Sequence, residues 1–203
     1  MPDALRTLTA ALFAAAVTGT TLAGELQFER TLDLHGSGIG LTQDSLAVPT
    51  FPAELGKLLE VRVEVGIEHG TALALEHLSK GNFLCQSQQA DLIQVSLDDQ
   101  TAYVRQFNVM NYDYLGPFDG ELDYSGSSGT IQAQAIQEKT TSSLPATNSW
   151  LSSGERDRVE LRLDYFRAYS APGQPFLAVK DLGGRVQADV RVTYVYDEQS
   201  PNP

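Results

Sequence analysis

Residues 185–196 alternate between apolar and polar side chains, and this pattern constrains the fold more than any other feature of the chain. The apolar face holds Val186, Ala188, Val190, Val192, Tyr194 and Tyr196. The polar face holds Arg185, Gln187, Asp189, Arg191 and Thr193, and only Val195 departs from the rule. A period of two, rich in β-branched and aromatic residues, is typical of a β-strand with one buried and one solvent-facing side.

Other segments repeat this alternation, notably residues 58–67, 93–97 and 159–165. Turn residues at Glu68-His69-Gly70 and at Gly183-Gly184 predict that separate strands flank them, and we also expect strands at 118–124 and 131–137. About ten short strands without a long amphipathic helix predict an all-β fold, an antiparallel β-sandwich. A jelly-roll and an immunoglobulin-like topology both remain open.

Residues 1–23 have the pattern of a secretory signal peptide, with Arg6 before an apolar run and small residues leading to Ala23. The apolar run is too short for a membrane span, which needs about 20 residues. We expect cleavage after Ala23 and a single domain over residues 24–203, with no stable membrane insertion afterwards. The expected location is secreted, extracellular or at the cell surface, with the periplasm as an alternative.

The formal net charge is -12, which disfavours binding to nucleic acid and to anionic membranes. Cys85 is the single cysteine, so an intramolecular disulfide is excluded. It follows Phe83 and Leu84, which favours a small buried hydrophobic residue over a reactive thiol.

Three acidic residues, Asp119, Glu121 and Asp123, are spaced to share one face of a strand. Converging carboxylates bind hard cations, so calcium is the one cofactor that the sequence suggests. The alternative interpretation is a solvated acidic edge.

Aromatic residues offer a second candidate site, in which Trp150, Tyr112 and Tyr114, with Phe118, form a platform for stacking on a sugar ring. The alternative is that these rings fill the ends of the core. His35, His69 and His77 are too widely spaced for a local metal motif, and each is expected to be solvated in or near a turn. Without a nucleophile–base pair, we expect the chain not to be an enzyme.

Several short runs of the chain occur in the same order as the segments of a known domain family. In the first, a leucine–proline–phenylalanine segment from Leu46 to Phe51 precedes Gly56 and a long strand. The matching runs are residues 46–58, 75–79, 118–129 and 190–196. In these runs the chain resembles the choice-of-anchor E domain family.

The resemblance implies an exported, β-rich bacterial or archaeal surface domain without assigned catalytic residues, usually followed by a sorting tail such as PEP-CTERM. The printed sequence reaches Pro203 without such a tail, so we expect release or attachment through another protein. The predicted function is a non-catalytic structural or interaction domain of the bacterial cell envelope or extracellular matrix. A carbohydrate-binding module is the alternative. The expected partner is an envelope or matrix protein or a polysaccharide, and a homo-oligomer is compatible with this interpretation.

Overall fold

The computed structural model describes residues 23–36, 39–152 and 157–198, and these residues form eight β-strands and two short 3₁₀ helices. The strands are β1 (Ala23–Gly36), β2 (Gly40–Pro49), β3 (Lys57–His77), β4 (Phe83–Leu97), β5 (Gln100–Leu115), β6 (Gly129–Pro145), β7 (Arg158–Ser170) and β8 (Leu177–Asp197). The helices are η1 (Ala53–Leu55) and η2 (Asn148–Trp150). The predicted signal peptide lies outside the described residues, except for Ala23, which begins β1.

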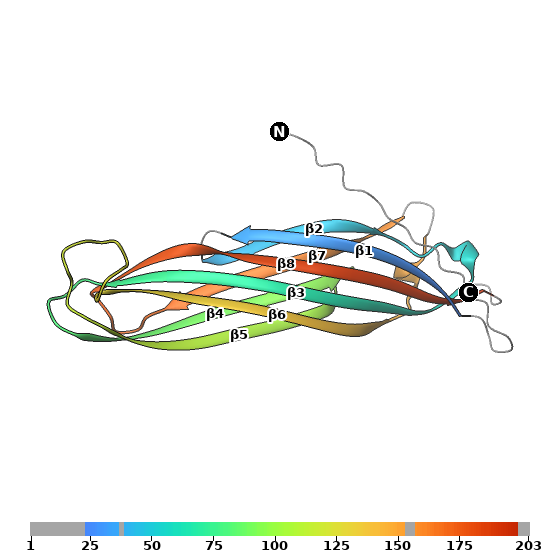
Figure 1. Ribbon diagram of the computed structural model, residues 1–203. Coiled ribbons are helices and arrows are strands. Elements are labelled where there is room, and N and C mark those ends of the chain that lie inside the picture. Colours follow the sequence, from blue (N-terminus) through green and yellow to red (C-terminus); the bar gives the residue numbers. More distant parts are fainter. Residues whose placement is uncertain (1–22, 37–38, 153–156, 199–203) are drawn as a thin grey trace, which may run out of the picture.

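The strands form two four-stranded antiparallel sheets that pack face to face as an elongated sandwich (Figure 1). Sheet A has the order β1-β8-β3-β6, and sheet B has the order β2-β7-β4-β5. β1 pairs with β8, β2 with β7, β3 with β6 and β4 with β5, as if one long hairpin had been rolled up. This is the jelly-roll arrangement, so the predicted all-β sandwich is confirmed and its open topology is settled.

The expected number of about ten strands is wrong, because two predicted turns lie inside strands. Residues 68–70 continue β3, where β6 and β8 hydrogen-bond the backbone from both sides. Gly183 and Gly184 lie within β8, where a register shift opposite Thr71–Leu73 accommodates them. Residues 118–124, expected to be a strand, belong to the loop between β5 and β6.

The core between the sheets has two apolar clusters. The large cluster includes Val192 and Tyr194 on β8 and extends through η2, where Trp150 is fully buried. The small cluster contains Leu75, Cys85 and Leu115. The predicted apolar face of residues 185–196 is confirmed by the burial of its members from Val186 to Tyr194, while Thr193 is buried although its face was expected to be wet.

The sandwich is long for its width. β3 has 21 residues. At roughly 3.3 Å per residue such a strand spans about 70 Å. Positions at opposite ends of β3 are therefore too far apart to share a binding site. In the part of the chain that the structure describes, no helix has the length and apolar character to span a membrane.

Candidate functional site

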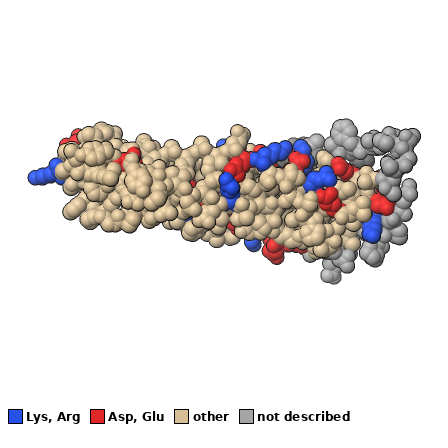
Figure 2. Space-filling view, turned by 90° about the horizontal axis from the view of Figure 1, so that it is seen from below, with Lys and Arg blue, Asp and Glu red and all other residues tan. Residues whose placement is uncertain are grey.

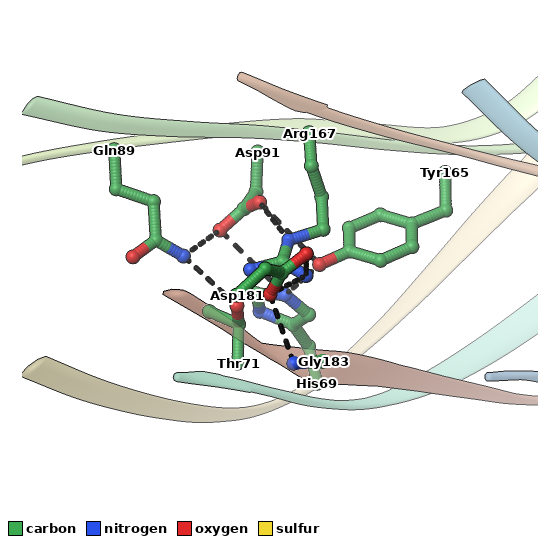
Figure 3. Close-up of polar contacts among 8 residues, drawn as sticks. All are labelled: His69, Thr71, Gln89, Asp91, Tyr165, Arg167, Asp181 and Gly183. Atoms are coloured by element: carbon green, nitrogen blue, oxygen red, sulfur yellow. Dashed lines mark hydrogen bonds and ion pairs between the residues drawn. The ribbon is translucent and has the colours of Figure 1, made fainter. Parts of the chain in front are cut away.

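A layer of polar side chains separates the two apolar clusters inside the sandwich. We call it the polar layer, and its members come from β3, β4, β7 and β8 (Figure 3). They are His69, Thr71, Gln89, Asp91, Tyr165, Arg167 and Asp181. All except Asp181 are at most 5% exposed.

Strand geometry directs these polar side chains into the interior of the sandwich. On β3 the inward alternation of Val65 and Ile67 continues through His69 and Thr71, so the backbone carries both side chains into the core. Opposite them, a Cβ atom on Gly184 would lie 2.9 Å from the Tyr165 hydroxyl oxygen. A glycine at this position in β8 therefore leaves room for the polar layer.

Arg167 is the only cation of the polar layer and contacts two carboxylates. Its Nη1 lies 3.0 and 3.2 Å from the two carboxylate oxygens of Asp181, and its Nε lies 3.6 Å from Oδ1 of Asp91. Asp181 Oδ1 also accepts a hydrogen bond of 2.8 Å from the backbone N–H of Gly183. Breaking a buried ion pair is costly, but the intact pair contributes little net free energy to folding, because desolvation offsets the attraction. These contacts therefore set the alignment of β7 on β8 more than they add stability.

His69 is neutral in this environment. Burial, with the nearby charge of Arg167, lowers the pKa of its imidazole to about 4. Its Nε2 lies 3.0 Å from the Tyr165 hydroxyl, which donates a hydrogen bond of 3.4 Å to Oδ1 of Asp91. The 3.7 Å approach of His69 to Asp91 is therefore no ion pair at neutral pH. Burial raises the pKa of Asp91, while the hydrogen bond from Gln89 acts in the opposite direction.

Hydrogen bonds of the layer cross from one sheet to the other. Gln89 on β4 donates from Nε2 across the sandwich to Thr71 Oγ1 on β3 at 3.0 Å, and also to Asp91 on its own strand at 3.0 Å. Nearby, Ser87 on β4 donates to Gln132 Oε1 on β6 at 2.8 Å. These directional contacts fix how the sheets stack, because a slip would leave buried polar groups unpaired.

The layer contains acid–base groups, but they face one another. His69, Asp91 and Tyr165 are each at most 3% exposed. Two shallow hollows on the outer surface of sheet A include His69 and Thr71 in their lining, but the side chain of His69 is 0% exposed and that of Asp91 is 1% exposed. A substrate would have to part the sheet to reach these groups. The geometry thus supports a structural role.

The acidic site residues Asp119, Glu121 and Asp123 lie in the loop, and their expected placement on one strand is wrong. Asp119 Oδ1 accepts the backbone N–H of Glu121 at 3.0 Å, and Asp123 Oδ1 accepts that of Ser125 at 2.9 Å. The side chains of Asp119 and Asp123 therefore stabilise turns of the loop. Among the described residues, no three His, Cys, Asp or Glu side chains form a group that could hold a metal ion.

The predicted aromatic platform is not assembled. Trp150 is fully buried and donates from Nε1 to the carbonyl oxygen of Pro145 at 2.9 Å. Tyr112 and Tyr114 are instead 60% and 72% exposed on β5. Pro145 pairs with Glu60 near the start of β3, whereas Tyr114 lies near the other end of the sandwich. Trp150 therefore belongs to the core, the alternative that the sequence left open.

The histidine predictions are partly wrong, because His69 and His77 are buried on β3 whereas His35 is exposed. The alternation of residues 61–73, which places His69 in the same row as Val61 and Ile67, was the signal for burial of His69, and the turn residues concealed it. Cys85 is fully buried, and burial raises the pKa of its thiol to about 11, in agreement with the prediction of a small hydrophobic role.

On the outer surface of sheet B, the outward side chains of β4 and β5 carry no charge, a feature that we did not predict from the sequence. We call the outward positions of β4 and β5 the neutral face. They are Leu84, Gln86, Gln88, Ala90, Leu92, Gln94, Val104, Gln106, Asn108, Met110, Tyr112 and Tyr114. Phe166 on β7 and Leu41 on β2 continue the row of Leu92. In the view from below, charged side chains gather in the right-hand half, and the left-hand half is mainly uncharged up to its tip (Figure 2).

Fold and site together define a jelly-roll domain with an internal polar layer and an uncharged outer face. No protein-family model matches the chain. No curated protein matches it either. The resemblance to the choice-of-anchor E domain family therefore stays a prediction.

Among solved structures, the chain is similar to that of the infectious bursal disease virus Gx strain, with 10% identity and a TM-score of 0.29 over 97% of this chain and 44% of that chain. The VP2 subviral particle of the same virus is also similar, with 10% identity and a TM-score of 0.29 over 85% of this chain and 38% of that chain. The chain thus spans less than half the length of these proteins. A similarity at this level carries no functional argument, and the fold assignment depends on the strand pairing alone.

Proposed function

We propose that this chain is an exported, non-catalytic structural or interaction domain of the bacterial cell envelope or extracellular matrix, and that it contacts its partner through the neutral face. The observation that carries the proposal is that the neutral face, which runs along β4 and β5, has no charged side chain although the chain has a net charge of -12. A contact through this face desolvates none of the protein's charged side chains at these positions, so its burial is not opposed by the cost of burying a charge.

The apolar members of the neutral face support a contact surface. Leu84, Val104, Met110, Tyr112 and Tyr114 are all exposed. Single exposed apolar residues are ordinary, but a contiguous group of them marks an interaction site. Leu84 pairs directly with Tyr114, so these two are neighbours on the same face.

The closed polar layer supports a non-catalytic role, because its histidine, carboxylate and phenol are each at most 3% exposed. His35, the exposed histidine, lies 3.3 Å from Asp33, which Arg185 also contacts at 2.9 Å. Surface ion pairs of this kind contribute little to the stability of the fold on their own.

The test is retention on the envelope or matrix fraction of the producing cells, measured by co-sedimentation. Tyr112→Glu with Tyr114→Glu places two charges on the neutral face and should lower retention about tenfold or more. Gln187→Glu adds a charge on the outer face of sheet A and is the matched control. Equal retention of the wild type and the double variant would refute the proposal, as would a wild type that does not sediment.

A carbohydrate-binding module is the second candidate, and the arrangement on β5 favours it. Tyr112 and Tyr114 expose their rings on one face, where Gln86 on β4 lies opposite Tyr112 and Gln88 lies opposite Met110. Aromatic rings pack against the apolar faces of sugars, and amides both donate to and accept from hydroxyl groups. An uncharged strip fits a neutral, extended polysaccharide.

Depletion on insoluble cellulose and chitin separates the two candidates. Retention that is lost in Tyr112→Ala with Tyr114→Ala supports the carbohydrate-binding module. Concentration-dependent self-association in sedimentation velocity, without polysaccharide retention, supports a protein contact.

A further inference from the structure

Glu76 is a carboxylate at 0% exposure, and neither of its oxygens has a hydrogen-bond partner in the described ranges. It lies near the end of β3, where its register neighbours are Gly129 on β6 and Ala178 on β8. An ionised carboxylate without a partner is strongly disfavoured in the interior. Its burial therefore points to a ligand.

The side chain of Glu76 lies under a loop. Leu75 and His77, on either side of it, face the interior, so Glu76 projects from the outer face of sheet A. The loop of residues 116–128 folds back over this face at the left end of the molecule (Figure 1). A Cβ atom on Gly129 would collide with the main-chain nitrogen and oxygen of Ser125, so the loop backbone lies directly on the strand.

Ser128, at the end of the loop, has a second buried oxygen group without a partner. The Ser128 hydroxyl is fully buried and has no hydrogen-bond partner within the residues described. The carbonyl oxygen of Ser128 accepts the N–H of His77 at 2.9 Å, which brings this serine next to Glu76. Ser128 is therefore one register position from Glu76, and the main-chain oxygen of Ser125 would lie 2.6 Å from a Cβ atom on Gly129, the register partner of Glu76.

We propose that Glu76, with main-chain carbonyl groups of the 116–128 loop, binds a calcium ion that fastens this loop to sheet A. Calcium takes six to eight oxygen ligands in a flexible geometry, and carbonyl groups serve well among them. Zinc prefers nitrogen and sulfur. The nearest imidazole, that of His77, is occupied, because Nδ1 lies 3.0 Å from the carbonyl oxygen of Gly116 and Nε2 lies 2.8 Å from Ser79 Oγ.

The competing explanation is a neighbouring lysine. Lys180 pairs with Ala74 in the register of β8 and β3, so it lies on the same face as Glu76. Its Nζ lies 5.8 Å from the ring centroid of Tyr124 in the loop. An ammonium group that turned toward Glu76 would neutralise the carboxylate without calcium, so the test must separate the two cations.

The experiment measures the response of the full chain to Ca²⁺ after chelation, by calorimetric titration and by thermal melting. At a calcium concentration about 100 times the Kd, binding should raise the melting temperature by roughly 5–10 °C. Glu76→Gln keeps the shape of the side chain and removes its charge, so it should abolish both the heat and the shift. Glu121→Gln, in the same loop, should keep the response.

Three results would overturn the proposal: no heat and no shift in the wild type, an equal response in Glu76→Gln, or loss of the response in Glu121→Gln alone. Lys180→Gln should retain the calcium response. A wild type that ignores calcium, together with a lowered melting temperature in Lys180→Gln, would assign Glu76 to the lysine. Cleavage of the 116–128 loop by a protease gives a second readout, since calcium should slow it in the wild type and not in Glu76→Gln.

Discussion

Acidification should destabilise the fold through His69. Burial lowers the pKa of this imidazole from its ordinary value of 6.5 to about 4. Between these pH values the unfolded chain binds a proton at this position and the folded chain does not, so the free energy of unfolding falls as the pH falls. A pKa difference of about 2.5 corresponds to about 3 kcal/mol at 1.36 kcal/mol per pKa unit.

The groups around His69 influence this loss in different directions. The Arg167 cation opposes protonation of the imidazole, and Asp91, at 3.7 Å, favours it. Burial raises the pKa of Asp91 itself, and a raised carboxyl pKa contributes stability at low pH that is lost as the pH rises. The contribution of His69 must therefore be isolated by comparison with a variant that keeps the other groups.

His69→Gln is that variant, because its amide nitrogen can take the place of Nε2 beside the Tyr165 hydroxyl. Urea unfolding at intervals from pH 7 to pH 4 gives the free energy of unfolding of both proteins. Over this range the wild type should lose about 3 kcal/mol more than His69→Gln. Parallel pH profiles, or a wild type that gains stability relative to the variant on acidification, would refute the reasoning.

Three further outcomes follow from burial and close packing. Val192→Asp should unfold the domain, because position 192 is 1% exposed, whereas Arg191→Asp on the opposite face should cost about 1 kcal/mol, and thermal melting compares them. Gly184→Ala should cost about 1–3 kcal/mol because its Cβ would meet the phenol of the polar layer at 2.9 Å. Gly81→Ala is the control, because a Cβ atom at position 81 would meet no atom within 4 Å beyond its chain neighbours. Equal melting temperatures of the two glycine variants would contradict the close packing at Gly184. Cys85, buried with a pKa near 11, should react with iodoacetamide only when the fold opens, so labelling should accelerate in step with denaturant, and rapid labelling of the native chain would contradict its burial.

The alternation of side chains was sufficient to predict the class of fold and most of the core. Val190 and Val192 are buried as predicted, because which face a strand residue occupies is a local property of extended backbone. The absence of charge at alternate positions of residues 84–94 and 104–114 could also have been read from the sequence, and it would have predicted the neutral face.

Strand length and the polar layer could not be predicted in this way. Residues 68–70 contain turn-forming types, yet β6 and β8 hydrogen-bond this segment and keep it extended. Arg167, Asp91 and Asp181 lie on three different strands, and only the pairing of β4 with β7 and the packing of β8 over them bring their charges together.

By itself, the sequence determined the class of fold and which side of most strands is apolar, because the face of a strand residue depends on neighbours two residues apart. Only the tertiary structure decided the register, the burial of Glu76 beneath a loop and the exposure of Tyr112 and Tyr114 at a distance from Trp150. These depend on segments that are distant in the chain and meet only when the two sheets close on each other.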